Sequence, residues 1–339
     1  MSVAQTEIVT GPSSVLASAD HASSPQGPRV YVFVAAKIVF SLGLMFWIFE
    51  RANMTEIVGA LQPANVPLLC GAFILNFVGY GLSVSRWQIL LRVQGIQASR
   101  FYLVKSYMVA FFFNNLLPST FGGDAVRAYD SWKIGKSKAK AVVAVFADRF
   151  LGLVALTILV WGGLMLSWEL TTTLPLFPVW IIGSTVGAVG LCWLVFSPKG
   201  ESVQAFSHTG PKIVGKAFRV FQKGVEAFRA FKDQKKTLVY ALGLSIGLQV
   251  NVIVYYYLIA QSLHFHIPLY SFFFFIPLVL FMMMIPVTIN GIGIRENAFV
   301  YFLGIYGVST SEALAFAWLT YAFILIQGVL GGIVYMLRR

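Results

Sequence analysis

The sequence predicts an all-α integral membrane protein, with about six full transmembrane helices and two broken, re-entrant helical hairpins that form an inverted-topology repeat. The first observation is composition, since 58% of the 339 residues are hydrophobic, 11% are charged and the mean hydropathy is +0.77. Globular domains carry about 25% charged residues. The second is a series of apolar runs near the ~20 residues that cross a bilayer as a helix. The third is a sequence skeleton that occurs twice.

The repeated skeleton is Pro-x-Thr-x-x-Gly-x-x-x-Arg, and each copy follows a long apolar run. The two copies are Pro118, Thr120, Gly123 and Arg127, and Pro286, Thr288, Gly291 and Arg295. Proline and glycine interrupt helices. Paired interrupted segments in the two halves of a membrane protein indicate a substrate site at the interface between repeats.

The formal net charge of +12 lies mostly in short loops between the apolar runs. The positive-inside rule accounts for this distribution, so we expect no nucleic-acid partner. Residues 1–28 are rich in Ser, Ala, Gly and Pro and predict a disordered cytoplasmic tail, not a signal peptide. Residues 29–339 then form a single polytopic membrane domain. Cys70 and Cys192 lie inside apolar runs and indicate neither a disulfide framework nor a metal cluster.

In the first half, three full spans are predicted: Val30–Phe49, Val66–Ser85 and Ala141–Leu166. Between the last two, the apolar run Phe101–Leu117 is broken from Pro118 to Asp124. Basic residues flank this segment on both sides, so a hairpin that enters and leaves on the cytoplasmic side satisfies the charge bias. Residues 66–166 form the first predicted repeat.

In the second half, three further full spans are predicted: Pro178–Phe196, Thr237–Leu263 and Ala313–Leu337. The second broken segment, Pro268–Ile285 followed by Pro286–Gly304, is entered from outside, and repeat two covers residues 237–337. The loop 197–236 is basic and cytoplasmic, and its part Pro211–Lys236 predicts an amphipathic helix on the anionic inner leaflet. Alternatively, each hairpin is a pair of short crossing helices, which raises the count to about ten.

The first break is a candidate site for an anionic headgroup. Asp124 is placed to cap the helix that follows, and the free N–H groups of that helix with Arg127 one turn later suit a phosphate or carboxylate. The alternative is a capped break whose Arg127 reaches lipid headgroups. The candidate binding residues here are Asn115, Thr120, Gly122, Gly123, Asp124 and Arg127.

The second break offers Asn290, Gly291, Gly293, Arg295 and Glu296. Asn290 is placed to cap the following helix. Because Arg295 is followed directly by Glu296, the two side chains either contact the substrate or form a structural ion pair.

Two further candidates, Asp148 and Arg149, are charged residues inside an apolar span. Charges at that depth usually face the bundle interior and are paired. We expect Asp148 to meet a basic group such as Arg127, and Arg149 to face the cavity or the headgroups. Alternatively, both lie at the cytoplasmic interface near Lys140. No hydrolase, metalloprotease or nucleotide-binding motif occurs, and we expect no catalytic residue, metal or cofactor.

Several motifs together resemble the flippase-like family of the lysylphosphatidylglycerol synthase transmembrane domain. They are Asn115-Leu-Leu-Pro118-Ser119, Gly122-Gly123-Asp124-Ala-Val-Arg127, the pair Asp148-Arg149, and Asn290-Gly-Ile-Gly-Ile-Arg295-Glu296. The similarity covers nearly all of the chain from Val30, and the family includes stand-alone bacterial members and an archaeal member linked to dolichol-phosphate-mannose. It implies a multi-pass protein of the bacterial cytoplasmic membrane. The distribution of basic residues predicts that both termini are in the cytoplasm.

The resemblance implies a stand-alone lipid translocase or lipid-handling protein. Together with the paired breaks and their arginines, it predicts a translocase that binds an anionic phospholipid or polyprenyl-phosphate-linked headgroup between the hairpins. No soluble acyltransferase-like domain follows in this sequence, so we expect translocation and not lipid synthesis. One alternative is a membrane glycosyltransferase with a lipid-phosphate sugar donor, in which Asp124 or Asp148 serves as base. Another is a secondary transporter of small solutes with the same repeat design.

Overall fold

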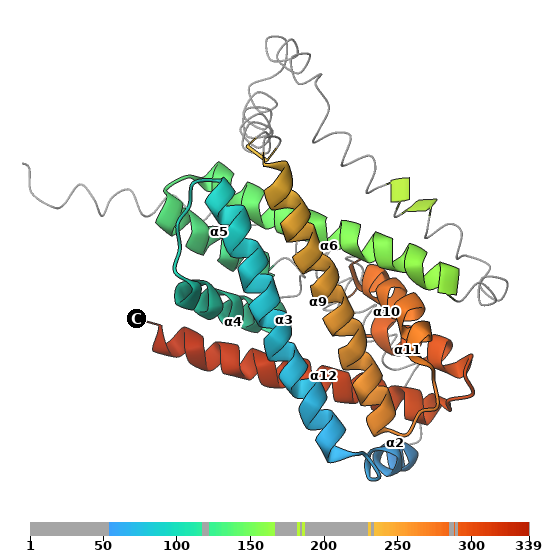
Figure 1. Ribbon diagram of the computed structural model, residues 1–339. Helices are drawn as coiled ribbons and strands as arrows, with labels where there is room; N and C mark the ends of the chain where they lie inside the picture. Colours follow the sequence, from blue (N-terminus) through green and yellow to red (C-terminus); the bar gives the residue numbers. More distant parts are fainter. Residues whose placement is uncertain are drawn as a thin grey trace, which may run out of the picture.

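The structure, a computed structural model, describes residues 54–116, 122–166, 182–183, 185–186, 230–231, 234–284, 288 and 291–338. Across these residues the fold is entirely helical, with no strand (Figure 1). Four predicted features lie outside the described residues, entirely or for most of their length: the tail 1–28, the spans Val30–Phe49 and Pro178–Phe196, and the amphipathic segment Pro211–Lys236.

Four long helices are α3 (Val66–Val93), α6 (Lys138–Leu166), α9 (Lys235–Ser262) and α12 (Thr310–Leu337), and each is apolar and long enough to cross a membrane. At about 1.5 Å per residue, their 28 or 29 residues exceed the hydrocarbon thickness of a bilayer. Large apolar side chains point outward along them. These helices confirm the four corresponding predicted spans and a multi-pass membrane protein.

Helix α3 extends beyond the predicted span Val66–Ser85, because it continues through Arg86 and Trp87 to Val93. Both of these side chains are buried. The helix begins where the Asn65 side chain accepts a hydrogen bond from the Leu68 N–H, which satisfies one of the free donors of the first turn. The helix is therefore longer than the predicted span, because Arg86 and Trp87, residue types that commonly mark a membrane boundary, continue it into the protein interior.

Four shorter helices flank the two predicted breaks: α4 (Arg100–Leu116), α5 (Gly122–Gly135), α10 (Leu269–Met284) and α11 (Ile294–Gly304). They contain 17, 14, 16 and 11 residues, respectively. A further helix, α2 (Met54–Leu61), was not predicted, and it contacts α12 through a hydrogen bond from Ser311 to Glu56 at 2.8 Å.

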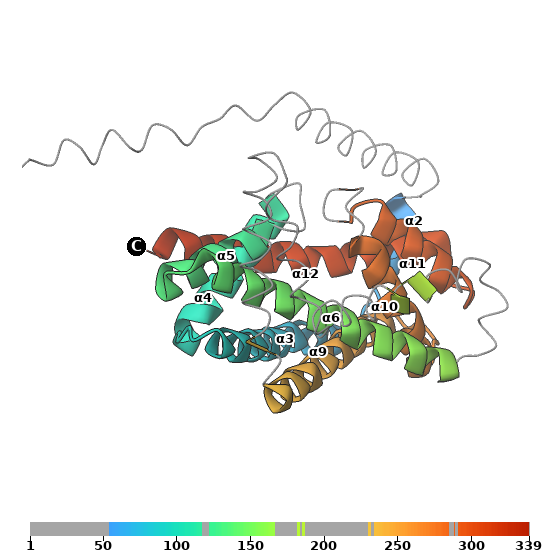
Figure 2. The same cartoon turned by 90° about the horizontal axis from the view of Figure 1, so that it is seen from above.

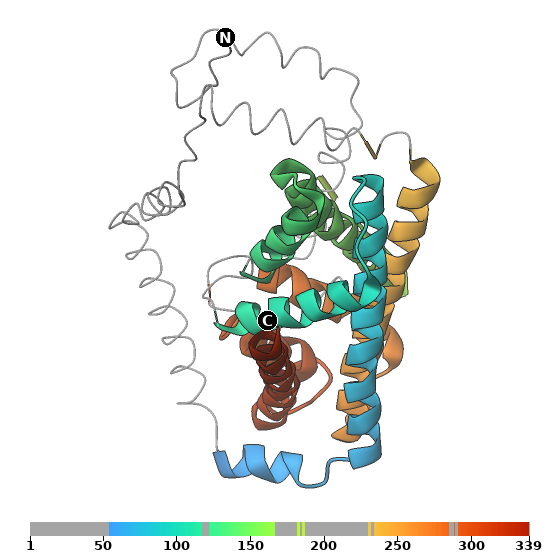
Figure 3. The ribbon, with the colours of Figure 1, turned by 90° about the vertical axis from the view of Figure 1, so that its left-hand side faces the viewer.

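Helices α3 and α9 lie side by side and antiparallel (Figure 3). At one end, the Asn65 N–H before α3 donates to the carbonyl oxygen of Ser262, the last residue of α9, at 2.8 Å. At the other end, Leu90 of α3 shares a buried cluster with Leu238 and Leu242 of α9. The two helices are therefore paired along their whole length.

Helices α6 and α12 each connect the two halves of the fold. Helix α6 contacts α5 and α10, and helix α12 contacts α11 and α4. In Figure 2 both helices run the length of the fold, with α4 and α5 at one end and α10 and α11 at the other. The end of α12 is fixed to α5, because Arg338 donates to Asp130 at 2.7 Å.

Glycines permit these crossings. A Cβ atom at Gly163 of α6 would lie 2.5 Å from the carbonyl oxygen of Phe273 in α10, and one at Gly331 of α12 would overlap that of Met108 in α4. Small residues allow helix backbones to approach closely in membrane proteins. The two crossings are therefore backbone contacts, which leave no room for a side chain.

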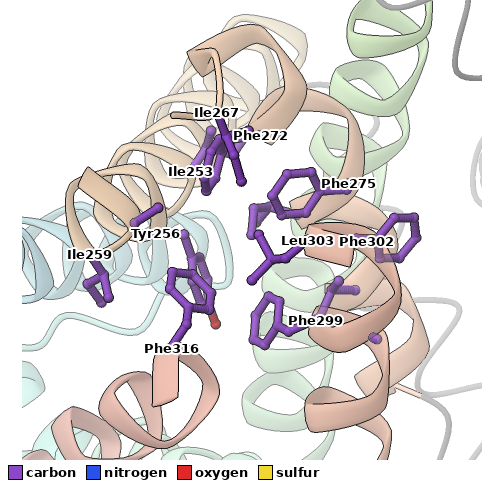
Figure 4. Packing of buried hydrophobic residues seen from close by; sticks show 14 of the residues in the cluster. Ile253, Tyr256, Ile259, Ile267, Phe272, Phe275, Phe299, Phe302, Leu303 and Phe316 are labelled. Carbon is purple, nitrogen blue, oxygen red and sulfur yellow. The ribbon is translucent and has the colours of Figure 1, made fainter. Parts of the chain in front are cut away.

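The largest buried cluster lies among α9, α10, α11 and α12 (Figure 4). Aromatic rings dominate it: Phe275 stacks on Phe302 with ring centroids 5.8 Å apart, and Phe299 meets Phe316 edge to face at 4.9 Å. Aromatic pairs of this geometry contribute beyond the area that they bury. Helices α10 and α11 are thus embedded in an aromatic core.

We predict that Gly163→Ala destabilises the fold by about 1–3 kcal/mol, because the added methyl group forces α6 and α10 apart. The measurement is unfolding of the purified protein in detergent. The matched control is Gly162→Ala on the same helix, where an added Cβ meets nothing within 4 Å. We expect the control to be neutral or slightly stabilising, since alanine favours helices by about 1 kcal/mol over glycine. Equal effects of the two substitutions would contradict the close crossing.

Candidate functional site

A buried carboxylate lies between two arginines at the junction of α3, α5 and α6. Arg86 Nε donates to Asp148 Oδ1 at 2.6 Å, and Arg127 Nη2 donates to Asp148 Oδ2 at 2.8 Å. All three residues are at most 5% exposed. Arg86 also donates to Ser245 of α9 at 2.9 Å. The predicted contact between Asp148 and Arg127 is confirmed, and Arg86 is an additional partner.

The Arg127 guanidinium also packs on aromatic rings. Its central carbon lies 4.5 Å from the centroid of the Trp87 ring and 5.0 Å from that of Tyr107. A cation is attracted to the negative face of an aromatic ring, most strongly where water is excluded. Arg127 is therefore held on two sides by rings and on a third by Asp148.

A second ion pair lies at the edge of this cluster. Arg149 Nε donates to Asp124 Oδ2 at 2.7 Å, and the Arg149 side chain is 42% exposed while that of Asp124 is 13% exposed. Asp124 also lies 3.6 Å from Arg127. Adjacent residues on a helix point about 100° apart. Asp148 therefore points into the protein, and Arg149 points toward the cavities described below. The expectation that Arg149 faces the cavity is confirmed.

The prediction that Asp124 caps α5 was wrong. Helix α5 begins at Gly122, so Asp124 lies within its first turn, and the Gly123 N–H donates instead to Asn114 Oδ1 of α4 at 2.6 Å. A Cβ at Gly123 would lie 2.5 Å from the carbonyl oxygen of Ala110, so this close approach requires glycine. The amide end of α5 is thus capped by a side chain of α4, and Asp124 remains available to Arg149.

Two cavities meet at these residues. The smaller one, which we call the charged pocket, has a volume of about 280 Å³, and Asn114, Gly123 and the five charged side chains line it. The larger cavity has a volume of about 1110 Å³ and lies among α3, α4, α5, α6, α9, α10 and α12. Tyr107, Asp124 and Arg149 line both. The charged pocket and the larger cavity therefore share a wall.

The second break is arranged differently. The Gly293 N–H donates to Glu296 Oε2 at 2.6 Å, and Arg295 Nη2 donates to Glu296 Oε1 at 2.5 Å. Arg295 also packs on the Tyr321 ring, and Arg295 and Glu296 are at most 2% exposed. Gly291 and Gly293 have positive φ angles, 74° and 86°, which glycine adopts without strain.

The break therefore forms the structural ion pair that was one of its two predicted roles. Neither cavity described above is lined by Gly291, Gly293, Arg295 or Glu296.

The remaining predicted residues occupy three kinds of position. Asn115 donates to the carbonyl oxygen of Ile324 at 3.0 Å and packs α4 on α12, so it lies outside both cavities. Gly122 is buried at the start of α5. Thr120 and Asn290 lie outside the described residues.

Four residues of the site were not predicted: Arg86, Trp87, Tyr107 and Asn114. Arg86 and Trp87 follow an apolar run, where basic and aromatic residues commonly mark the membrane interface. The only signal for Arg86 in the sequence is its position directly after the apolar run, where the helix can continue without a break. Tyr107 and Asn114 lie within the apolar run of α4, and nothing in their spacing distinguishes them from its other polar residues.

A comparison with protein families supports the resemblance found in the motifs. The model of the lysylphosphatidylglycerol synthase TM region matches residues 34–332. No curated protein matches the chain.

We predict that Asp148→Asn destabilises the protein by about 3–5 kcal/mol, because it leaves the buried Arg86 without a counter-charge and leaves Arg127 with only the longer contact to Asp124. The measurement is the unfolding free energy of the purified protein in detergent. Asp124→Asn is the control, since its short ion pair is with the far more exposed Arg149 and Arg127 keeps Asp148 as its closer partner, and we expect a loss below about 1 kcal/mol. If both variants lost the same stability, the central role of Asp148 would be refuted.

Proposed function

Because the chain belongs to the family of the lysylphosphatidylglycerol synthase transmembrane region, we propose that it binds an anionic headgroup, of a phospholipid or a polyprenyl-phosphate-linked lipid, and moves it across the bilayer. The observation that carries this proposal is the charged pocket, which shares a wall with the larger cavity. A lipid combines a charged headgroup with apolar chains, so two adjoining spaces of different character suit it.

The charge of the pocket favours an anion. Its five charged lining residues are Arg86, Asp124, Arg127, Asp148 and Arg149. Three guanidinium groups against two carboxylates leave one positive charge, which a phosphodiester would neutralise. Arginine binds phosphate oxygens through a planar fork of donors. We assign the phosphate contact to Arg149, because Arg86 and Arg127 are buried against Asp148.

The larger cavity suits the part of the lipid that is not charged. Its wall on α6 includes Val142, Phe146 and Phe150, and its wall on α10 includes Leu280 and Met283. Val142 and Phe146 are 56% and 49% exposed, so the α6 wall lies partly at the protein surface. Apolar chains leaving the headgroup there contact lipid, which avoids the cost of drawing them through a polar passage.

An inverted-topology repeat would explain how the site is reached from both leaflets. Its support is the antiparallel pairing of α3 with α9, and the matched crossings of α6 on α10 and of α12 on α4. The two crossing glycines, Gly163 and Gly331, are 168 residues apart, the same spacing that separates Arg127 from Arg295. Alternating access in such repeats is a rocking of one unit against the other around a fixed site.

Re-entrant hairpins are part of this proposal. The 17 residues of α4 and the 11 of α11 correspond to about 26 Å and 17 Å of helix, less than the ~30 Å of hydrocarbon. The basic flanks of α4 and α5 favour an entrance to that hairpin on the cytoplasmic side. We accordingly propose a protein of the bacterial cytoplasmic membrane with both termini in the cytoplasm.

In the proposed mechanism, the second break has a supporting role. Arg295 and Glu296 pair with each other and are buried, so we assign them to holding the second hairpin rather than to the headgroup. Met283 and Met284, at the end of α10, line the larger cavity on this side. The first break would therefore bind the lipid, and the second would provide an apolar wall.

Translocation is favoured over sugar transfer by the positions of the carboxylates. Both oxygens of Asp148 accept hydrogen bonds from guanidinium groups, and Asp124 is paired with Arg149. A general base needs an oxygen directed at the substrate hydroxyl. We propose that both carboxylates position arginines and that the lipid crosses without covalent change.

We predict that Arg149→Gln slows leaflet exchange of a fluorescent phosphatidylglycerol in proteoliposomes by about tenfold or more. A lost charged hydrogen bond costs about 1.5–3 kcal/mol, and 1.4 kcal/mol corresponds to a factor of ten. The measurement is the rate at which probe from the inner leaflet, initially protected from dithionite, reaches the outer leaflet and is quenched. Arg149→Lys keeps the charge without the planar fork, and its exchange rate should lie between those of the wild type and Arg149→Gln.

The matched control is Lys140→Gln, which removes an exposed positive charge from the same helix outside both cavities. Lys140→Gln should exchange lipid at the wild-type rate. Wild-type exchange by Arg149→Gln, with normal unfolding, would refute the assignment. Lipid extracted from the same vesicles should keep its mass, and a glycosylated product would instead support an enzyme.

A further inference from the structure

The larger cavity contains uncharged polar groups at a distance from the charged cluster. Asn76 and Tyr80 of α3, Asn251 of α9 and Gln327 of α12 all line it. They come from three helices that are otherwise apolar enough to cross the membrane. Polar side chains inside a membrane protein are costly unless they are paired, and they usually face the bundle interior. Four of them around one cavity suit a ligand with polar groups of its own.

Gln327 is the member of this group with a buried polar atom that lacks a hydrogen-bond partner within the described residues. The Tyr80 hydroxyl donates to Gln327 Oε1, whereas Gln327 Nε2 has no hydrogen-bond partner within the described part of the chain. The residue is 4% exposed and lines the larger cavity, so its amide is shielded from the outer surface of the protein. A buried donor without an acceptor costs free energy, which a ligand oxygen would recover.

Aromatic contacts connect Gln327 to the charged pocket. Tyr107 lies against Arg127, and its ring centroid is 5.9 Å from that of Tyr80, which holds Gln327. Tyr107 lines both cavities. A headgroup whose phosphate is in the charged pocket would therefore extend past Tyr107 toward Tyr80 and Gln327.

The chemistry of these groups suits hydroxyls. Amides and phenols both donate and accept hydrogen bonds, as a hydroxyl does. A cationic amine would need a carboxylate, and the one carboxylate among the described residues that line the larger cavity is Asp124, which is paired with Arg149. An uncharged polyol matches the wall better than an amine does.

We infer that Gln327 and Tyr80 form a second recognition subsite, which binds the hydroxyl groups of a polyol attached to the lipid phosphate. This inference rests on the proposed function, because it assigns the neutral part of the headgroup whose phosphate Arg149 would bind. The substrate class is thereby narrowed to phosphodiester lipids that carry a glycerol-like or sugar-like group.

The test uses two probes of equal charge and chain length, dioctanoyl phosphatidylglycerol and dioctanoyl phosphatidylethanol, and the full-length purified protein. Only the first carries free hydroxyls beyond the phosphate. Calorimetric titration should show that the wild type binds phosphatidylglycerol about two- to tenfold more tightly, which corresponds to one or two neutral hydrogen bonds. Gln327→Leu should bind both probes equally, with its affinity for phosphatidylethanol unchanged.

Tyr80→Phe provides a second variant that keeps the ring and removes the hydroxyl, and it should also lose the preference. Equal binding of both probes by the wild type would overturn the subsite, as would a preference retained by both variants. Arg149→Gln tests the proposed function separately, because it should weaken both probes by the same factor. If the preference depended on Gln327 while Arg149→Gln weakened neither probe, the subsite would stand and the phosphate assignment would fail. A wild type that binds neither probe would refute both.

Discussion

The site depends on one buried carboxylate, Asp148, which neutralises two arginines from different helices. In a low-dielectric interior a guanidinium without a counter-charge is strongly destabilising. Arg86 and Arg127 can therefore be buried only where Asp148 reaches both, at 2.6 and 2.8 Å. This requirement brings α3, α5 and α6 together, and the hydrogen bond from Arg86 to Ser245 adds α9. The charged pocket lies at this junction, and Arg149, one residue after Asp148, faces outward from it.

The two copies of the repeated skeleton differ in what surrounds them. Around the first, Arg127 finds its counter-charge on another helix, and the adjoining space is open enough to form a pocket. Around the second, Arg295 is neutralised by its neighbour Glu296, and the aromatic core fills the remaining space. The same Pro and Gly positions thus permit a helix break in both halves, while the location of the acidic partner decides whether the arginine joins a cavity wall. The difference follows from local electrostatics, because Arg295 is already neutralised by the adjacent Glu296 and needs no acidic partner from another helix.

The sequence alone predicted the class of the protein and most of its described helices. Long apolar runs gave α3, α6, α9 and α12, since nothing but a membrane or a buried core accommodates them. Proline and glycine marked the ends of α4 and α10 and the starts of the helices that follow. A charged pair inside an apolar run indicated the site, since burying Asp148 and Arg149 there costs free energy and such charges usually have a functional role. These predictions rest on the hydrophobic effect and on backbone sterics, which act on each segment separately.

Only the tertiary structure decided which groups meet. Asp148 lies 62 residues from Arg86 in the chain, and helical periodicity assigns each residue a face but not a partner on another helix. The cap of α5 likewise comes from Asn114 across the hairpin and not from Asp124 in the helix itself, since the position of one arm against the other is set by packing at Gly123. Arg86 and Trp87 have the composition of a membrane boundary and become part of the core because α4, α5 and α6 cover them. Which side chains meet across two helices depends on where the helices cross. The crossing points are set by the packing of all the helices together.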